Sequence, residues 1–264
     1  MKRFITGAAS IFILDVYFNA SAHFISNSAA QFICLLLFFP FASYIAKING
    51  LEGLKGIGFR LDQNSLKYFT ASFIMGFGAW AIMYAVYWRL GKFEIIGIKS
   101  GMDAVMTLVF VAVGFLLGSL INDLITRGLI INLLKGKLAP IYLAGISIFA
   151  YAADDFWNGD LTVMNFVFSI ILGLSFTYSF LKTGSVWADT GIHFGLNTAF
   201  GLLYGLNGNE GGGILVIKQG KIDSVLNNMI VLSFAALLFA VSYIYYRGKS
   251  NEKKRDNNVV ADVI

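Results

Sequence analysis

Long apolar stretches dominate this sequence, and each is about as long as the helix that crosses a lipid bilayer. A membrane-spanning helix needs about 20 mostly apolar residues. Only 13% of the 264 residues are charged, against about 25% in soluble domains. We therefore predict an all-α, polytopic transmembrane helix bundle with about eight spans. The candidate spans are residues 4–20, 28–46, 67–88, 104–126, 139–153, 162–181, 186–205 and 224–246.

The first span has the weakest pattern, because Asp15 interrupts it. Lys2, Arg3 and the run Ala20-Ser21-Ala22 are also typical of a cleavable signal peptide. We favour a retained helix, since at least six further spans follow and the sequence has no pattern of a secreted domain. Both interpretations stay open from the sequence.

Basic residues are unevenly distributed among the predicted loops. With a cytoplasmic N-terminus, most of the 20 Lys and Arg residues fall on the cytoplasmic side, as the positive-inside rule requires. We therefore predict a cell-membrane protein whose two termini are cytoplasmic. Residues 1–246 form one transmembrane bundle, and residues 247–264 form a basic, disordered tail near lipid headgroups. The net charge is +5, but the basic residues are scattered and predict no nucleic-acid partner.

A first polar cluster lies toward the cytoplasmic end of the fourth span. Asp123 and Arg127 are four residues apart, as are Asn122 and Thr126, so each pair shares one helix face. Ionisable groups inside a span are costly and are therefore candidates for function. The alternative is an ion pair that only fixes helix packing.

A second polar cluster follows one face of the seventh span. Asp189, His193 and Asn197 recur at intervals of four residues. We predict that this stripe lines a polar cavity. The alternative is interhelical hydrogen bonding, which is common in membrane bundles. Gly114 and Gly118 are spaced for the close approach of two helices.

The donor set for a metal site is small. The chain has two histidines, whereas a catalytic zinc ion usually takes three protein ligands and a water molecule. A metal here would need His193 with Asp123 and Asp189, an oxygen-rich set that suits zinc poorly. We predict no bound metal or cofactor, with zinc expected only if the protein is an active enzyme.

The order of these motifs resembles the CPBP family of intramembrane metalloproteases, which includes the CAAX prenyl proteases and the bacterial Abi proteins of bacteriocin self-immunity. The resemblance covers about residues 50–205 and implies a bacterial source. Family members carry Glu-Glu-x-x-x-Arg, then Phe-x-x-x-His, then His-x-x-x-Asn after a Thr-Gly-Ser-Leu-Trp-like turn. The corresponding positions here are Asn122-Asp123 with Arg127, Phe149 with Ala153, His193 with Asn197, the turn at 182–187 and the loop at 57–60.

This chain departs from the family at the positions that carry the chemistry. The resemblance implies that the first Glu activates the hydrolytic water, but Asn122 replaces it, and an amide cannot act as a base near neutral pH. Ala153 replaces the second-motif His, and Asp123 keeps a shorter carboxylate. Asp154 would point about 100° away from Ala153 on a continuous helix, so we do not expect it in the site.

These features predict a catalytically degenerate family member, a pseudoenzyme with a self-immunity or regulatory role. It would bind a hydrophobic or lipidated peptide, or another membrane protein, in a cavity within the bilayer. We expect Thr126, Arg127, Phe149, Ala153 and Asp189 to line that cavity, beside the motif positions Asn122, Asp123, His193 and Asn197.

Two other functions remain open from the sequence. One is an active intramembrane metalloendopeptidase with a remodelled site that uses Asp123, Asp189 and His193. The other is a small transporter with acidic and basic groups along its path, although the sequence shows no convincing inverted repeat.

Overall fold

The computed structural model describes the backbone of residues 2–158 and 162–261, without the side chains of residues 2–4, 155, 158 and 249–261. Helices dominate, which confirms the predicted all-α polytopic bundle. The helices are α1 (Lys2–Phe24), α2 (Ser28–Ile48), α3 (Gly53–Gly56), α4 (Ser65–Arg89), α5 (Gly101–Asp123), the π-helical turn η1 (Leu124–Leu129), α6 (Ile130–Leu134), α7 (Pro140–Ala153), the 3₁₀ turn η2 (Asp154–Asn158), α8 (Val163–Thr183), α9 (Val186–Tyr204) and α10 (Ser224–Ala261).

Six described helical segments are long and apolar enough to cross a membrane by length and composition, whereas eight spans were predicted. The other two predicted spans are helices that do not meet these criteria of length and composition. The stretch at 139–153 is α7, whose 14 residues extend about 21 Å, less than the bilayer core of about 30 Å. The stretch at 186–205 is α9, which is mostly buried among other helices and can therefore carry polar side chains.

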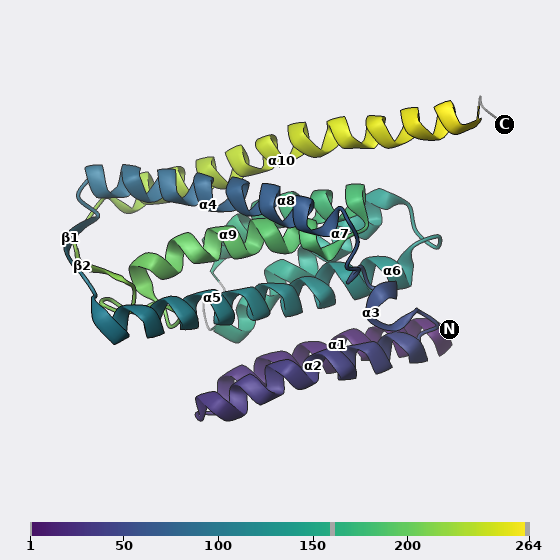
Figure 1. Cartoon of the computed structure of the whole chain (residues 1–264), viewed down its shortest axis with the longest axis horizontal. Coiled ribbons are helices and arrows are strands. Elements are labelled where there is room, and N and C mark those ends of the chain that lie inside the picture. Colours follow the sequence, from purple (N-terminus) through teal and green to yellow (C-terminus); the bar gives the residue numbers. More distant parts are fainter. Residues whose placement is uncertain (1, 159–161, 262–264) are drawn as a thin grey trace.

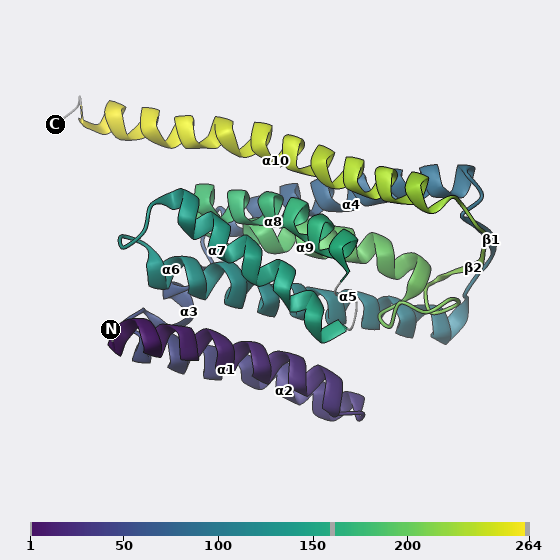
Figure 2. The ribbon, with the colours of Figure 1, turned by 180° about the vertical axis from the view of Figure 1, so that it is seen from behind.

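Helix α9 lies in the middle of the bundle, packed against α4, α5 and α8. Helix α10 covers α4 and α8 on one side, and the α1–α2 hairpin lies on the opposite side, along α5 (Figures 1 and 2). One hydrophobic core joins the hairpin to α5, η1 and α6, and a second joins α4, α8, α9 and α10. The central position of α9 brings its polar stripe into contact with the motif residues of α5 and η1.

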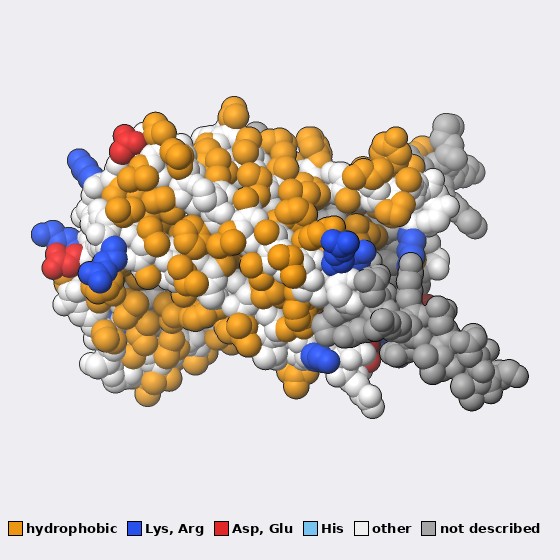
Figure 3. Space-filling model, turned by 90° about the horizontal axis from the view of Figure 1, so that it is seen from above, with side chains coloured by type: hydrophobic (Ala, Val, Ile, Leu, Met, Phe, Trp, Pro, Cys, Tyr) orange, Lys and Arg blue, Asp and Glu red, His pale blue; other side chains and the backbone are white. Residues whose placement is uncertain are grey.

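Apolar side chains cover the middle of the molecule, and charged side chains gather at its two ends (Figure 3). Helix α1 begins and α10 ends at the same end of the bundle (Figure 1). This distribution matches a bundle whose apolar middle faces lipid tails and whose ends face water.

Helices α4 and α9 approach each other through glycines. A Cβ atom added at Gly191 or Gly195 would lie 2.5 Å from the carbonyl oxygen of Phe69 or Phe73, and one added at Gly76 would overlap the Ile192 carbonyl oxygen. Contact between backbones is how membrane helices pack closely. Of the two glycines predicted for such a contact, Gly118 faces open space, and a Cβ atom at Gly114 would lie 2.6 Å from the Leu206 side chain.

Two strands, which the sequence analysis did not predict, pair at the end of the bundle opposite the chain ends (Figure 1). β1 (Phe93–Ile98) and β2 (Leu215–Gln219) run antiparallel, with Phe93 opposite Gln219 and a bulge between Ile95 and Gly97. The pair joins the connection after α4 to the connection after α9. It therefore fixes one end of the cavity described below.

Helix α10 continues to Ala261, through most of the tail for which disorder was predicted. Adding residues to an existing helix avoids the cost of nucleation, and Lys, Arg and Glu favour helix. Residues 262–264 lie outside the described part of the chain.

Candidate functional site

The centre of the candidate site is a buried ion pair at the junction of α5 and η1. Arg127 Nη1 donates to Asp123 Oδ1 at 2.6 Å, and both side chains are fully buried. The same nitrogen donates to Thr126 Oγ1 at 2.8 Å and lies 3.4 Å from Asn122 Oδ1. The predicted pairing of Asp123 with Arg127 is therefore present. It occurs at a π-helical turn, a rare distortion that is frequent at functional sites.

Aromatic rings complete the surroundings of Arg127. Its guanidinium carbon lies 4.3 Å from the ring centre of Tyr151 on α7 and 4.9 Å from that of Phe176 on α8. Nε and Nη2 have no hydrogen-bond partner among the described residues. The two ring faces stabilise the cation where hydrogen bonds do not.

His193 joins α9 to this pair. Its Nδ1 lies 3.3 Å from Asp123 Oδ1, and its ring stacks on Phe176 with centres 4.9 Å apart. Thr190 Oγ1, one turn earlier, donates to Asp123 Oδ2 at 2.9 Å. Both oxygens of the Asp123 carboxylate are therefore engaged by neighbouring side chains.

A carboxylate that the sequence analysis excluded reaches the first motif position. Asn122 Nδ2 donates to Asp154 Oδ2 at 2.7 Å, and Asn19 Nδ2 of α1 donates to Asp154 Oδ1 at 2.9 Å. The expected direction of Asp154 was wrong because α7 ends at Ala153 and the chain continues as the 3₁₀ turn η2. The same contacts bring the first helix into the site, which no sequence motif indicated.

Asp189 lies in the first turn of α9 and is fully buried. Neither carboxylate oxygen has a hydrogen-bond partner among the described residues. The carboxyl group lies close enough to Asp123 and Arg127 for an electrostatic interaction with both. Asp189 thus belongs to the same buried cluster, one turn before His193.

The loop of residues 57–60 holds the start of α9. Gly58, at φ +93°, places its carbonyl oxygen 3.1 Å from the backbone nitrogen of Val186, which donates to it. Trp187 Nε1 donates to the Arg60 carbonyl oxygen at 2.8 Å. These contacts fix the position of the turn from which the polar stripe of α9 extends.

A cavity of about 750 Å³ opens beside His193 and Asn197 and extends toward β1 and β2. Asn197 Nδ2 donates to Ser119 Oγ of α5 at 3.1 Å. Tyrosine and phenylalanine rings and four asparagines line much of the cavity: Tyr84, Tyr87, Phe115, Tyr151, Phe168, Phe200, Tyr204, Asn165, Asn197, Asn207 and Asn227.

Lys92, at the strand end of this cavity, is a lining residue that sequence reasoning missed. Its Nζ donates to Asn227 Oδ1 at 2.5 Å and lies 3.9 Å from the centre of the Tyr87 ring. Burial lowers the pKa of Lys92. No motif surrounds this residue, which lies between α4 and β1 and is held by backbone hydrogen bonds to Tyr87 and Gly220.

The structure places the residues that were predicted to line one cavity in three different surroundings. His193 and Asn197 line the cavity, whereas Thr126, Arg127 and Asp189 are buried behind it in the protein interior. Phe149 and Ala153 line a different groove, between α1, α7 and α8. They face away because Tyr151, two residues from each, occupies the face of α7 that meets His193.

The residues present do not fit a catalytic zinc ion. Within the described part of the chain, no three His, Cys, Asp or Glu side chains form a group that could hold a metal ion. Ala153 offers no donor atom, and the Asp123 oxygens already accept from Thr190 and Arg127. We therefore derive no chemical step through a metal.

Residues 104–199 match the family model described as type II CAAX prenyl endopeptidase Rce1-like. The match covers the chain from α5 to most of α9 and includes all three motif positions. It confirms the resemblance recognised in the sequence. No curated protein and no solved structure gave a match to the chain.

Proposed function

We propose that this membrane helical protein, whose residues 104–199 form an Rce1-like CAAX protease family domain, binds a hydrophobic or lipidated peptide without cleaving it. The peptide would occupy the cavity beside His193. It would be either a segment of another membrane protein or a free peptide in the bilayer. A regulatory or self-immunity role would follow from holding such a peptide and preventing its action.

The observation that carries this proposal is the chemistry of the motif residues. Asn122 donates to Asp154 and has no basic atom that could activate water. Ala153 stands where the second motif has a histidine, so its imidazole is missing. The Asp123 carboxylate is engaged by the side chains of Arg127, Thr190 and His193. Because residues of one catalytic constellation act as a unit, losing two of them removes most of the catalytic advantage.

The cavity supports peptide binding. Its volume of about 750 Å³ is within the range of ligand sites, about 300–1,000 Å³. Aromatic rings would contact apolar side chains, and the asparagine amides can donate to and accept from a peptide backbone. Asn197 and Asn227 stand toward opposite ends of the lining, next to His193 and Lys92.

A binding experiment with product analysis tests the proposal. The full chain in lipid nanodiscs is titrated with a fluorescent, hydrophobic peptide panel, each peptide with and without a prenyl group, and every sample is then examined by mass spectrometry. We expect at least one peptide to bind and to be recovered intact. Asn197→Ala should weaken binding about tenfold through loss of a polar contact.

The control is Asn64→Ala, an exposed asparagine at the start of α4, which should bind like the wild type. Cleavage by the wild type that Asp123→Ala abolishes would overturn the proposal. Equal binding by the wild type and Asn197→Ala would overturn the choice of cavity.

One contact supports a second candidate, the active endopeptidase with a remodelled site. The Asp154 carboxylate, 2.7 Å from Asn122 Nδ2, places a potential base beside the first motif position. This candidate predicts cleavage of the same panel and loss of that cleavage in Asp154→Asn. Absence of cleavage in a wild-type preparation that binds peptide would exclude it.

A further inference from the structure

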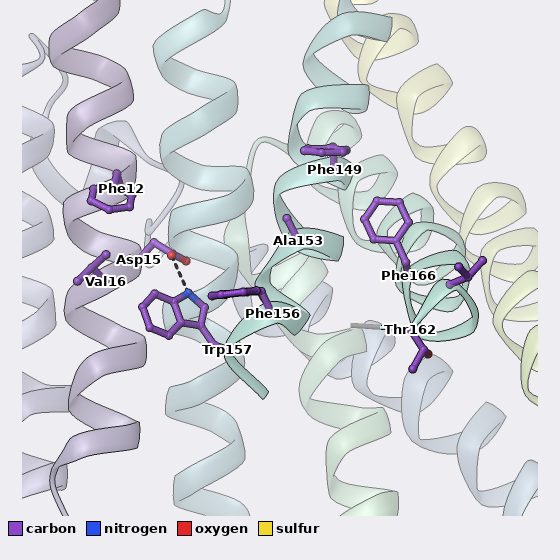
Figure 4. A pocket seen from close by; sticks show the side chains of 10 residues that line it. Phe12, Asp15, Val16, Phe149, Ala153, Phe156, Trp157, Thr162 and Phe166 are labelled. Atoms are coloured by element: carbon purple, nitrogen blue, oxygen red, sulfur yellow. Dashed lines mark hydrogen bonds between the residues drawn. The ribbon is translucent and has the colours of Figure 1, made fainter. Parts of the chain in front are cut away.

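A second hollow lies on the other side of α7 from the His193 cavity. This groove of about 780 Å³ is formed by α1, the end of α7, η2 and the start of α8 (Figure 4). It shares no lining residue with the cavity. Whatever it binds is therefore separate from the peptide of the proposed function.

The groove is aromatic, and Asp15 carries the single carboxylate among its described lining residues. Its lining residues are Phe12, Asp15, Val16, Phe149, Ala153, Phe156, Trp157, Thr162, Val163 and Phe166. Figure 4 shows the rings of Phe149 and Phe166 on one side of the groove, and Phe12, Asp15 and Trp157 on the other.

The described side chains that donate hydrogen bonds to the Asp15 carboxylate are neutral. Trp157 Nε1 donates to Oδ2 at 3.0 Å, and Asn19 Nδ2 donates to Oδ1 at 3.2 Å. Among the side chains that the structure describes, no Lys, Arg or His lies within 4.0 Å of it. These hydrogen bonds orient the carboxylate but leave its negative charge uncompensated. A charge without a counter-ion inside a membrane helix is expensive and points to a functional partner.

We propose that this groove binds a lipophilic cation of drug size. The carboxylate supplies the opposite charge, and aromatic faces attract cations through their negative π systems. The apolar walls match the organic body of such a molecule, and the volume is within the range for one ligand of this kind. A lipophilic anion of the same shape would be repelled by Asp15.

Two probes of matched shape and opposite charge test this proposal. Binding of tetraphenylphosphonium and of tetraphenylborate to the full chain in nanodiscs is measured by equilibrium dialysis, with empty nanodiscs subtracted. We expect saturable binding of the phosphonium and none of the borate. Asp15→Asn should weaken phosphonium binding about tenfold or more, because it removes the charge and preserves the shape.

Two further variants separate binding from folding. Asp103→Asn changes an acidic residue that is 69% exposed at the start of α5 and should bind phosphonium like the wild type. Ala153→Leu keeps Asp15 and fills part of the groove, so it should also weaken binding. If Asp15→Asn does not fold, the binding of phosphonium to Ala153→Leu tests the proposal in its place. Equal binding by Ala153→Leu or a folded Asp15→Asn, or equal binding of the two probes, would overturn the proposal.

Discussion

At the residue scale, the Asp123 carboxylate is the group on which the site depends. It accepts hydrogen bonds from Arg127 and Thr190 and contacts His193. Three helical segments, α5, η1 and α9, therefore meet at one side chain. Removing one member of a buried ion pair leaves the other charge without compensation in a low-dielectric interior. Such a loss costs more than the pair contributes when it is intact.

We therefore predict that Asp123→Ala and Arg127→Ala each lower the free energy of unfolding by about 3 kcal/mol. The double variant should lose clearly less than the sum, because neither charge is then left alone. Unfolding by a denaturing detergent measures all three variants. The control is the partly exposed pair Lys99 and Asp103, also four residues apart, whose coupling should be below about 1 kcal/mol. Each pair is analysed by a double-mutant cycle. An equal coupling energy for Asp123 with Arg127 and for Lys99 with Asp103 would contradict the interpretation of a buried ion pair.

The contact of Asp123 with Arg127 could be predicted from the sequence, because residues four apart on a helix are neighbours. The contact of Asp154 with Asn122 could not. It depends on α7 ending at Ala153 and on η2 turning the next side chain inward. The role of Asn19 depends on how the α1–α2 hairpin docks, which local sequence does not encode.

At the element scale, the packing of α4 against α9 places the polar stripe. Gly76, Gly191 and Gly195 allow the two backbones to touch. Small residues were expected to matter, but spacing alone indicated Gly114 and Gly118, of which Gly114 packs against the Leu206 side chain and Gly118 faces open space. The reason is that many glycines share this spacing, and only the neighbouring helix decides which of them form a contact.

Helix α4 offers a matched pair of glycines for a test. A Cβ atom at Gly76 would overlap the Ile192 carbonyl oxygen, whereas one at Gly78 would meet nothing within 4 Å. Gly76→Ala should destabilise the bundle by about 1–3 kcal/mol through overpacking. Gly78→Ala should be neutral or slightly stabilising, since Ala favours helix. Equal effects in detergent unfolding would contradict the close contact of α4 with α9.

At the scale of the whole molecule, the all-α membrane architecture could be predicted from apolar length alone. The number of candidate spans could not, because α9 is as long as a span but its polar stripe makes it less apolar than the six candidate segments. The strand pair was missed since two short strands far apart in sequence leave little local signal. Which end of the bundle is cytoplasmic stays a prediction from the distribution of basic residues.

Single cysteines at the two ends of the bundle test that orientation. Asp62 and Lys221 are exposed, before α4 and after β2. In a Cys34→Ser background, a membrane-impermeant maleimide added to intact cells should label Lys221→Cys but not Asp62→Cys. Labelling of Asp62→Cys but not of Lys221→Cys would mean that the topology is reversed. If both were labelled only after lysis, neither end of the bundle would face the outside of the cell.

The central proposal is that residues 104–199, which match the Rce1-like family model, lack the chemistry of the family motif. The most direct measurement compares the wild type with an Asn122→Glu, Ala153→His double variant for bound zinc and for cleavage of the peptide panel. We predict no zinc and no cleavage for the wild type, with a gain of either only in the double variant, because only that variant carries the carboxylate and the imidazole of the family motif. Stoichiometric zinc and cleavage by the wild type, abolished by His193→Ala, would contradict the claim.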